Sequence, residues 1–235
     1  NVYTNIAQNS GGTQFEGGGV WNSGKLNMTG GKIVGNRAVS GAGVFTQGEF
    51  KFSGNAVISE NTGVILDKYG KEIVHKDDRE KTSPSTGGGV FIAYTSGKMT
   101  MSGGTIFGNS AAAGGGISIG NRNNWYNGGT LIMTGGSIES NEALGSDDFS
   151  GGGGIYVQMD GTATISKGSI INNKSYKGAY GGGGIYVNGG KSTEHKNGVR
   201  RLTKVKISDN TAEGAGGGIA ACGTSNVEIY LTDGG

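Results

Sequence analysis

The chain has 235 residues, of which 52 are glycine and one is proline, and its formal net charge is +2. Collagen requires glycine at every third position together with abundant proline, so the composition excludes a collagen helix. A nearly neutral chain with no run of 18 apolar residues also gives no reason to expect a nucleic-acid partner or insertion of this segment into a membrane.

Two short motifs recur along the chain. The tightest repeat, from Val20 to Val44, has 24 residues. The segments between the motifs alternate apolar and polar residues as β-strands do, for example in Leu26-x-Met28. In the first motif, glycine precedes Val20, Val44, Val90, Ile117, Ile155, Ile185 and Ile219. The second motif is Ile-x-x-Asn, at Ile6/Asn9, Ile33/Asn36, Ile58/Asn61, Ile106/Asn109, Ile138/Asn141, Ile170/Asn173 and Ile207/Asn210.

Three short strands fit into one such repeat, and no stretch shows a helical stripe. The sequence therefore predicts an all-β fold, a right-handed parallel β-helix (a solenoid) with three strands per rung and about seven rungs, forming one domain over residues 1–235. Glycines are expected at the corners, where they accept positive φ. The asparagines either form an inward ladder from rung to rung or support local turns.

The repeat is incomplete at both ends of the chain and is interrupted by insertions. The chain starts inside a rung, at Asn5-Ile6-x-x-Asn9, and stops inside one, at Ile229-x-Leu231. Neither end has an amphipathic cap, which suggests an uncapped fragment of a longer protein. Insertions are predicted at 63–86, 120–128, 142–150 and 188–201, and the first of them reads as a hairpin that turns near Tyr69.

Some candidate binding residues lie in or near these insertions. Trp125 and Tyr126 stand at the tip of 120–128, and Tyr180 comes directly before a glycine run. A local basic patch either keeps a loop soluble or binds an anionic ligand such as a sulfated or sialylated glycan. The residues of this patch are Lys191, Lys196, Arg200 and Arg201.

A second set of candidates comes from strand geometry. The residue after each inward Val or Ile must point outward. Aromatic residues on one exposed face would mark an interaction site. Alternatively, they stack between rungs for stability, or an insertion folds over them. The outward residues are Trp21, Phe45, Phe91, Ser118, Tyr156, Tyr186 and Ala220.

Catalysis has little support in the sequence. His75 and His195 are isolated, the single Cys222 allows no disulfide, and the acidic residues fall in different registers of the repeat. We therefore expect no enzyme, no metal site and no cofactor. Two alternatives to a binding domain stay open: a polysaccharide lyase or hydrolase, which needs clustered carboxylates, and a passive structural stalk.

The repeats GGGVWNSGKLNMTGGKIVGN and GGGVFIAYTSGKMTMSGGTIFGN resemble the glycine-rich GGxI/FxxN-type repeats of bacterial surface proteins. These include the polymorphic outer-membrane-protein family and glycine-rich β-helix adhesins. The resemblance covers residues 5–235 apart from the insertions. It implies an extracellular, surface-displayed or secreted adhesin, part of a larger surface protein, that binds a host protein, such as immunoglobulin or another glycoprotein, or a glycan.

Overall fold

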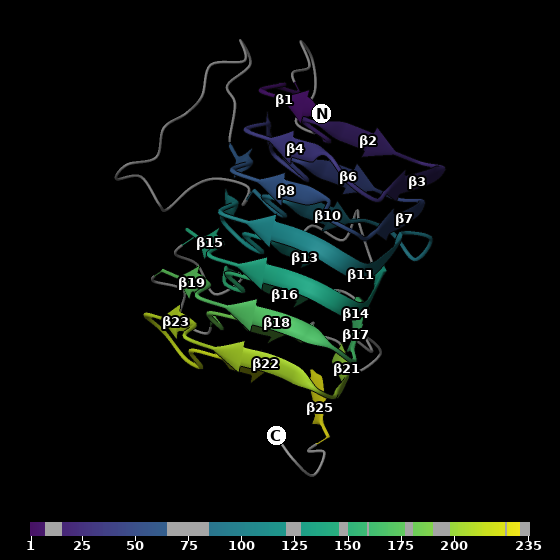
Figure 1. Cartoon of the computed structure of the whole chain (residues 1–235). Coiled ribbons are helices and arrows are strands. Elements are labelled where there is room, and N and C mark those ends of the chain that lie inside the picture. The colour runs from purple at the N-terminus through teal and green to yellow at the C-terminus, as the bar shows by residue number, and fades with distance from the viewer. Residues whose placement is uncertain are drawn as a thin grey trace.

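The structure is a computed structural model that describes residues 1–7, 16–64, 85–120, 128–145, 150–158, 160–176, 181–189, 198–223 and 225–230. Within these residues the chain is all-β and forms three parallel sheets, with no helix. No helix in this part of the chain is long and apolar enough to cross a membrane. Figure 1 shows the strands stacked from the N-terminus at one end to the C-terminus at the other.

Each sheet collects the same part of successive repeats. The seven-stranded sheet holds β2 (Val20–Asn22), β6 (Val44–Thr46), β10 (Val90–Ile92), β13 (Ile117–Ile119), β16 (Ile155–Gln158), β20 (Ile185–Asn188) and β24 (Ile219–Cys222). The six-stranded sheet holds β5 (Arg37–Ala38), β9 (Thr62–Gly63), β12 (Ser110–Ala111), β15 (Glu142–Ala143), β19 (Lys174–Ser175) and β23 (Thr211–Ala212).

The twelve-stranded sheet contains two columns, which β11 and β14 join because each runs through both. A repeat such as that of β6 to β9 therefore has four short strands, one more than predicted. The twelve strands are β1 (Val2–Tyr3), β3 (Lys25–Met28), β4 (Lys32–Val34), β7 (Glu49–Phe52), β8 (Val57–Ser59), β11 (Lys98–Phe107), β14 (Thr130–Glu139), β17 (Thr162–Ile165), β18 (Gly168–Ile171), β21 (Gly198–Leu202), β22 (Val205–Ser208) and β25 (Asn226–Ile229).

The core follows the alternation of the strands. In β7, Phe50 and Phe52 are fully buried, whereas Glu49 and Lys51 are exposed. Equivalent residues stack in register, as Ile117 does between Val90 and Ile155. One apolar cluster thus extends through all the repeats, and its side chains are contributed mainly by the seven-stranded and twelve-stranded sheets.

The asparagine ladder is confirmed. The backbone N–H and the Nδ2 of Asn61 both donate to Oδ1 of Asn109, at 3.0 and 2.9 Å, and Nδ2 of Asn61 also donates to the carbonyl of Ile33 at 3.0 Å. The same arrangement repeats at every step, so buried amides find partners in copies of themselves. The ladder consists of Asn5, Asn36, Asn61, Asn109, Asn141, Asn173 and Asn210.

The glycine directly before the inward Val or Ile lies against this ladder in the first six of these repeats. A Cβ added to Gly89 would come within 3.1 Å of Nδ2 of Asn109 and 2.6 Å of the carbonyl oxygen of Gly116. The same contacts recur at the equivalent glycine of the neighbouring repeats, for example at Gly154 with Asn173. The two sequence motifs are therefore the two sides of one close contact.

The residue before each ladder asparagine adopts a left-handed conformation. Two of these residues are glycine, but the others carry side chains, which makes the corner costly for them. The seven residues are Thr4, Gly35, Glu60, Gly108, Ser140, Asn172 and Asp209, with φ between +49° and +67°.

The structure corrects the predicted register at both ends. Val2 pairs with Ile33, and Asn5 is bonded to Asn36, so the first motif is Val2/Asn5 and not Ile6/Asn9. At the other end, Ile229 pairs with Leu202, so the alternating pair is Val227-x-Ile229 and not Ile229-x-Leu231. Leu202, whose strand carries a register shift, is the partner of Ile165.

The insertions are shorter than predicted, because their predicted margins pair within the sheets. Gly63 belongs to β9 and Thr86 forms bridges to its neighbours, Glu142 opens β15, and 198–201 belong to β21. Gly120 also donates a backbone hydrogen bond to Ile92. The predicted hairpin near Tyr69 lies outside the described residues.

Candidate binding surface

The predicted outward column exists as a stack of side chains. Trp21, Phe45 and Phe91 face one another in register across β2, β6 and β10. The rings of Trp21 and Phe45 are parallel within 2° at 6.3 Å, and those of Phe45 and Phe91 lie at 5.4 Å. Tyr156 and Tyr186 stack at 5.7 Å farther along. Ser118 interrupts the column between the two groups and donates to the carbonyl of Gly120.

The expected exposure of this column is wrong at four of its five aromatic residues. Phe45, Phe91 and Tyr186 are fully buried, and Tyr156 is 1% exposed. The outer face of the seven-stranded sheet is therefore a second apolar core, and not an open binding stripe.

The reason lies in the segment that precedes each glycine run. Residues there form their own column of parallel bridges, such as Ser40 to Thr86 and Ala113 to Gly151. The chain then turns at the first glycine and passes over the outward residue: a Cβ on Gly87, where φ is +65°, would lie 2.9 Å from Cβ of Phe91. Ala113 packs directly with the tyrosines in one buried cluster. The incoming chain thus covers the rings.

The buried tyrosine hydroxyl also has a structural role. Oη of Tyr156 donates to Oε1 of Gln158 at 2.7 Å and accepts from Nδ2 of Asn188 at 3.2 Å. Both partners are at least 96% buried. Because these groups satisfy one another away from water, Tyr156 is a structural residue in this fold.

Trp21 is the exception, and it stands at the N-terminal end of the column. Its side chain is 51% exposed, one face of the ring lies on Phe45, and its Nε1 donates to Oε2 of Glu16 at 3.3 Å. The indole is thus held in one orientation and still presents a large apolar surface to solvent.

A shallow groove of about 670 Å³ lies at the turn between the seven-stranded and twelve-stranded sheets in the first three repeats. Its lining is polar apart from one ring, that of Tyr94, which is 37% exposed and sits in a left-handed turn. Burial, followed by the charge of Glu16, raises the pKa of the Tyr94 hydroxyl, which therefore remains a donor. The lining residues are Ser23, Gly24, Lys25, Gln47, Gly48, Glu49, Tyr94 and Ser96.

Trp21, Glu16, Tyr94 and the groove are here called the N-terminal binding surface. The sequence indicated Trp21 but missed Glu16 and Tyr94. Glu16 belongs to the column of bridges before the glycine runs, where the residue type changes from repeat to repeat, and Tyr94 lies in a turn. The sequence held one signal for Tyr94, because it is an aromatic residue in the turn that follows the apolar strand β10 after Ala93. The surface combines aromatic rings with hydroxyl, amide, carboxylate and ammonium groups. That mixture suits a ligand that has an apolar face and many hydroxyls.

The predicted loop and basic-patch residues lie wholly or partly outside the described part of the chain. Trp125, Tyr126 and Tyr180 lie outside the described residues, as do Lys191 and Lys196. The backbones of Arg200 and Arg201 lie in β21, and the positions of their side chains fall outside the described part.

Among the described residues, no group of three or more His, Cys, Asp or Glu side chains is placed to hold a metal ion. Nothing in this part of the chain points to an enzyme. Comparison with protein-family models, with curated proteins and with solved structures gives no match to the chain.

Proposed function

We propose that the chain is a right-handed parallel β-helix of about seven rungs, part of an extracellular bacterial surface protein that acts as an adhesin. The parallel pairing of every strand with its counterpart one repeat later supports the architecture. The resemblance of the repeats to those of surface adhesins supports the location and the role.

The ligand in this proposal is a host glycan, free or carried on a glycoprotein, and it binds at the N-terminal binding surface. One observation carries the proposal: Trp21 is half exposed, stacked parallel to Phe45, and adjacent in the chain to the polar groove. A sugar ring has an apolar face that packs on an indole, and its hydroxyls pair with groups such as those of Gln47, Glu49 and Tyr94.

The test is binding of the protein to an array of host glycans and glycoproteins. Trp21→Ala is expected to weaken binding at least tenfold, whereas Trp21→Phe retains part of it. Phe107→Ala is the matched control, because Phe107 is 40% exposed on a different sheet and should leave binding unchanged.

The other possible results distinguish the alternatives to this proposal. Binding that survives Trp21→Ala places the site elsewhere and overturns the proposed surface. Absence of binding to every member of the array favours the passive stalk. Cleavage of a polysaccharide would favour the lyase or hydrolase alternative. Circular dichroism of each variant separates a loss of binding from a loss of fold.

A further inference from the structure

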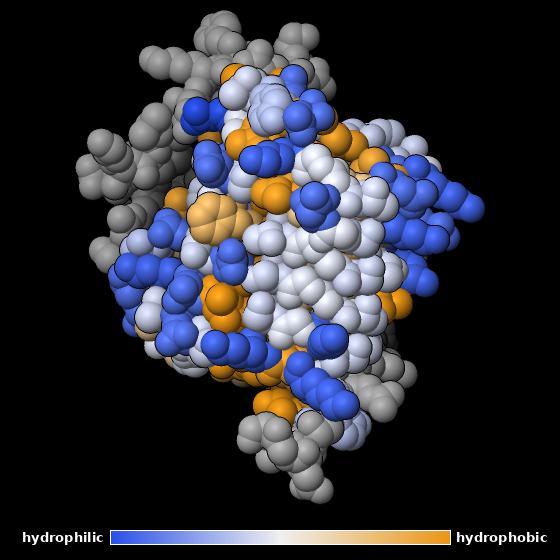
Figure 2. Space-filling view, viewed as in Figure 1, coloured by the Kyte–Doolittle hydropathy of each residue, from blue (hydrophilic) through white to orange (hydrophobic). Residues whose placement is uncertain are grey.

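Basic side chains gather beside the groove. Lys25, Glu49 and Lys98 occupy one outward column of successive strands, in the register Lys25 to Glu49 to Lys98. Lys51 follows Glu49 by two residues and so points from the same face of β7. All four side chains are exposed. Figure 2 shows hydrophilic side chains gathered at the edge where Figure 1 places β3 and β7.

Charged residues are absent from these columns in the next two strands, and a basic residue returns only at Arg200, which pairs with Thr164. In the next two strands the column of Lys25 continues with Thr130 and Thr162, whose hydroxyls lie 3.4 Å apart. The neighbouring column, that of Lys51, continues with Thr100, Ile132 and Thr164. Three cations and one anion therefore flank the groove, and the same sheet face carries none at the corresponding positions of β14 and β17.

We propose that the N-terminal binding surface selects an acidic saccharide. This inference rests on the proposed function. The sugar ring packs on Trp21, its hydroxyls meet the groove, and its carboxylate or sulfate lies over the lysine column. Strands in one sheet are about 4.8 Å apart, so Lys25 and Lys98 are separated by about 10 Å with Glu49 between them, and Lys51 lies beside this column on β7. An acidic group placed on the Lys51 side, away from Glu49, is within reach of Lys51 and of the long side chain of Lys25 or Lys98.

The charges are exposed, so the selection is electrostatic and sensitive to salt. The Debye length is about 8 Å at 0.15 M ionic strength and about 3 Å at 1 M, so added salt screens the lysines. Each exposed pair contributes little, and we expect about a three- to fivefold loss of affinity per lysine removed.

The test compares N-acetyllactosamine with its sialylated and its 6-sulfated forms, which share a backbone and differ in the acidic group. We expect both acidic forms to bind at least tenfold more tightly than the neutral form at 0.05 M salt. The triple variant Lys25→Gln/Lys51→Gln/Lys98→Gln should abolish that preference, because it lowers the affinity for both acidic forms to about that for the neutral form. Comparison of the two acidic forms shows whether carboxylate or sulfate is preferred.

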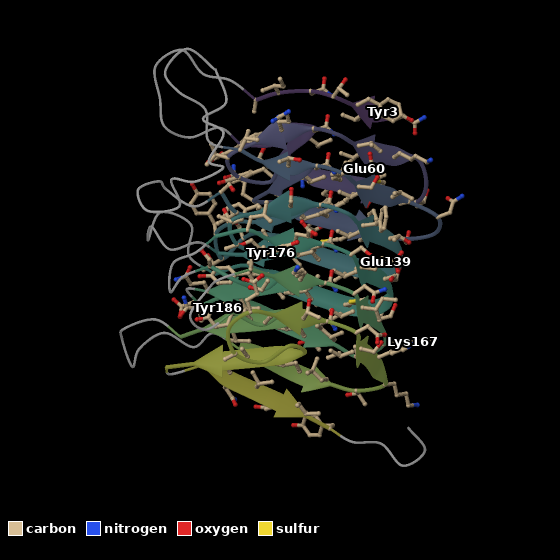
Figure 3. All side chains as sticks on the ribbon, turned by 90° about the vertical axis from the view of Figure 1, so that its left-hand side faces the viewer. Tyr3, Glu60, Glu139, Lys167, Tyr176 and Tyr186 are labelled. Atoms are coloured by element: carbon tan, nitrogen blue, oxygen red, sulfur yellow. The ribbon has the colours of Figure 1, made fainter. Side chains whose placement is uncertain are left out.

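The matched control is Lys167→Gln/Lys204→Gln/Lys206→Gln, which changes the net charge equally at exposed lysines far along the stack. Figure 3 shows Lys167 near the opposite end from Tyr3. This control should retain the preference. Equal binding of neutral and acidic forms that depends on Trp21 overturns the inference and leaves the proposed function standing. A preference lost equally in both triple variants is an effect of net charge and also overturns it. Absence of binding to all three probes overturns it as well, and the array then decides on the proposed function.

Discussion

Two columns of side chains run along the stack, and they differ in what holds them. In the asparagine ladder each amide is bonded to the next asparagine and to the preceding repeat's Ile carbonyl, so every interior member has the same surroundings. In the aromatic column the surroundings change, from the half-exposed Trp21 to the buried Tyr156. Where a side chain bonds to the same residue in the next repeat, the repeat alone determines its partners and burial. Where other segments cover the side chain, its burial depends on those segments and differs between repeats.

The largest effect is expected in the interior of the ladder. Asn109→Ala removes the acceptor of two donors on Asn61 and the donor to the carbonyl of Ile58. Each buried group left without a partner costs about 1–3 kcal/mol, so the free energy of unfolding should fall by about 5 kcal/mol. Urea denaturation measures it. Asn5→Ala, at the exposed end of the ladder, is the control and should cost below about 1.5 kcal/mol.

The aromatic column should divide into a structural and a binding part. Phe91→Ala empties a fully buried site and should cost about 4 kcal/mol. Trp21→Ala loses one stacking contact and should cost about 1 kcal/mol, while it abolishes ligand binding. Thermal unfolding measures the loss of stability of each variant, and binding to the glycan array measures its loss of ligand binding. Equal destabilisation by the two substitutions would contradict the division.

A smaller effect is expected where the ladder meets the glycine runs. Gly89→Ala places a Cβ against the carbonyl of Gly116 and the amide of Asn109, and overpacking of this kind costs about 1–3 kcal/mol. At Gly24 nothing lies within 4 Å of an added Cβ, so Gly24→Ala should change stability by less than about 0.5 kcal/mol. If both variants unfold at the same urea concentration, the close contact is not what requires glycine.

The smallest effect is a gain in stability. Ser140 has a φ of +54°, a conformation that costs a residue with a side chain about 1–2 kcal/mol. Glycine loses more backbone entropy on folding, so Ser140→Gly should stabilise the protein by only about 0.5–1 kcal/mol. A rise in the melting temperature checks this. Gly108→Ala, at the equivalent corner, should lower it.

The contrast between the columns also explains what the sequence could predict. Ile-x-x-Asn and the glycine runs recur, so parallel stacking, register and the ladder followed from periodicity. At Ile6/Asn9 the motif matched by chance, and pairing with Ile33 chose Val2 and Asn5 instead. The left-handed corners escaped notice because five different residues, besides glycine, occupy them.

The candidate site was predicted only in part. Alternation shows that Phe91 and Tyr156 point away from the inner core, but it does not show that the incoming chain at Gly87 and Ala113 covers them. Glu16 became a candidate only once the fold bonded its carboxylate to the Trp21 indole, and Tyr94 only once the fold brought it to the groove and within the influence of the Glu16 charge. The proposed binding site therefore rests on the residues around Trp21 and not on the repeated part of the column.

Hydroxyl-radical footprinting read by mass spectrometry tests most directly whether Trp21 alone in the aromatic column is exposed, because it reports the solvent exposure of each aromatic side chain in the unmodified protein. We predict rapid oxidation of Trp21 and strong protection of Phe45, Phe91, Tyr156 and Tyr186 relative to the urea-unfolded chain. Oxidation of Phe91 and Tyr156 at the rate found in the unfolded chain would contradict the account and restore the whole column as an exposed surface.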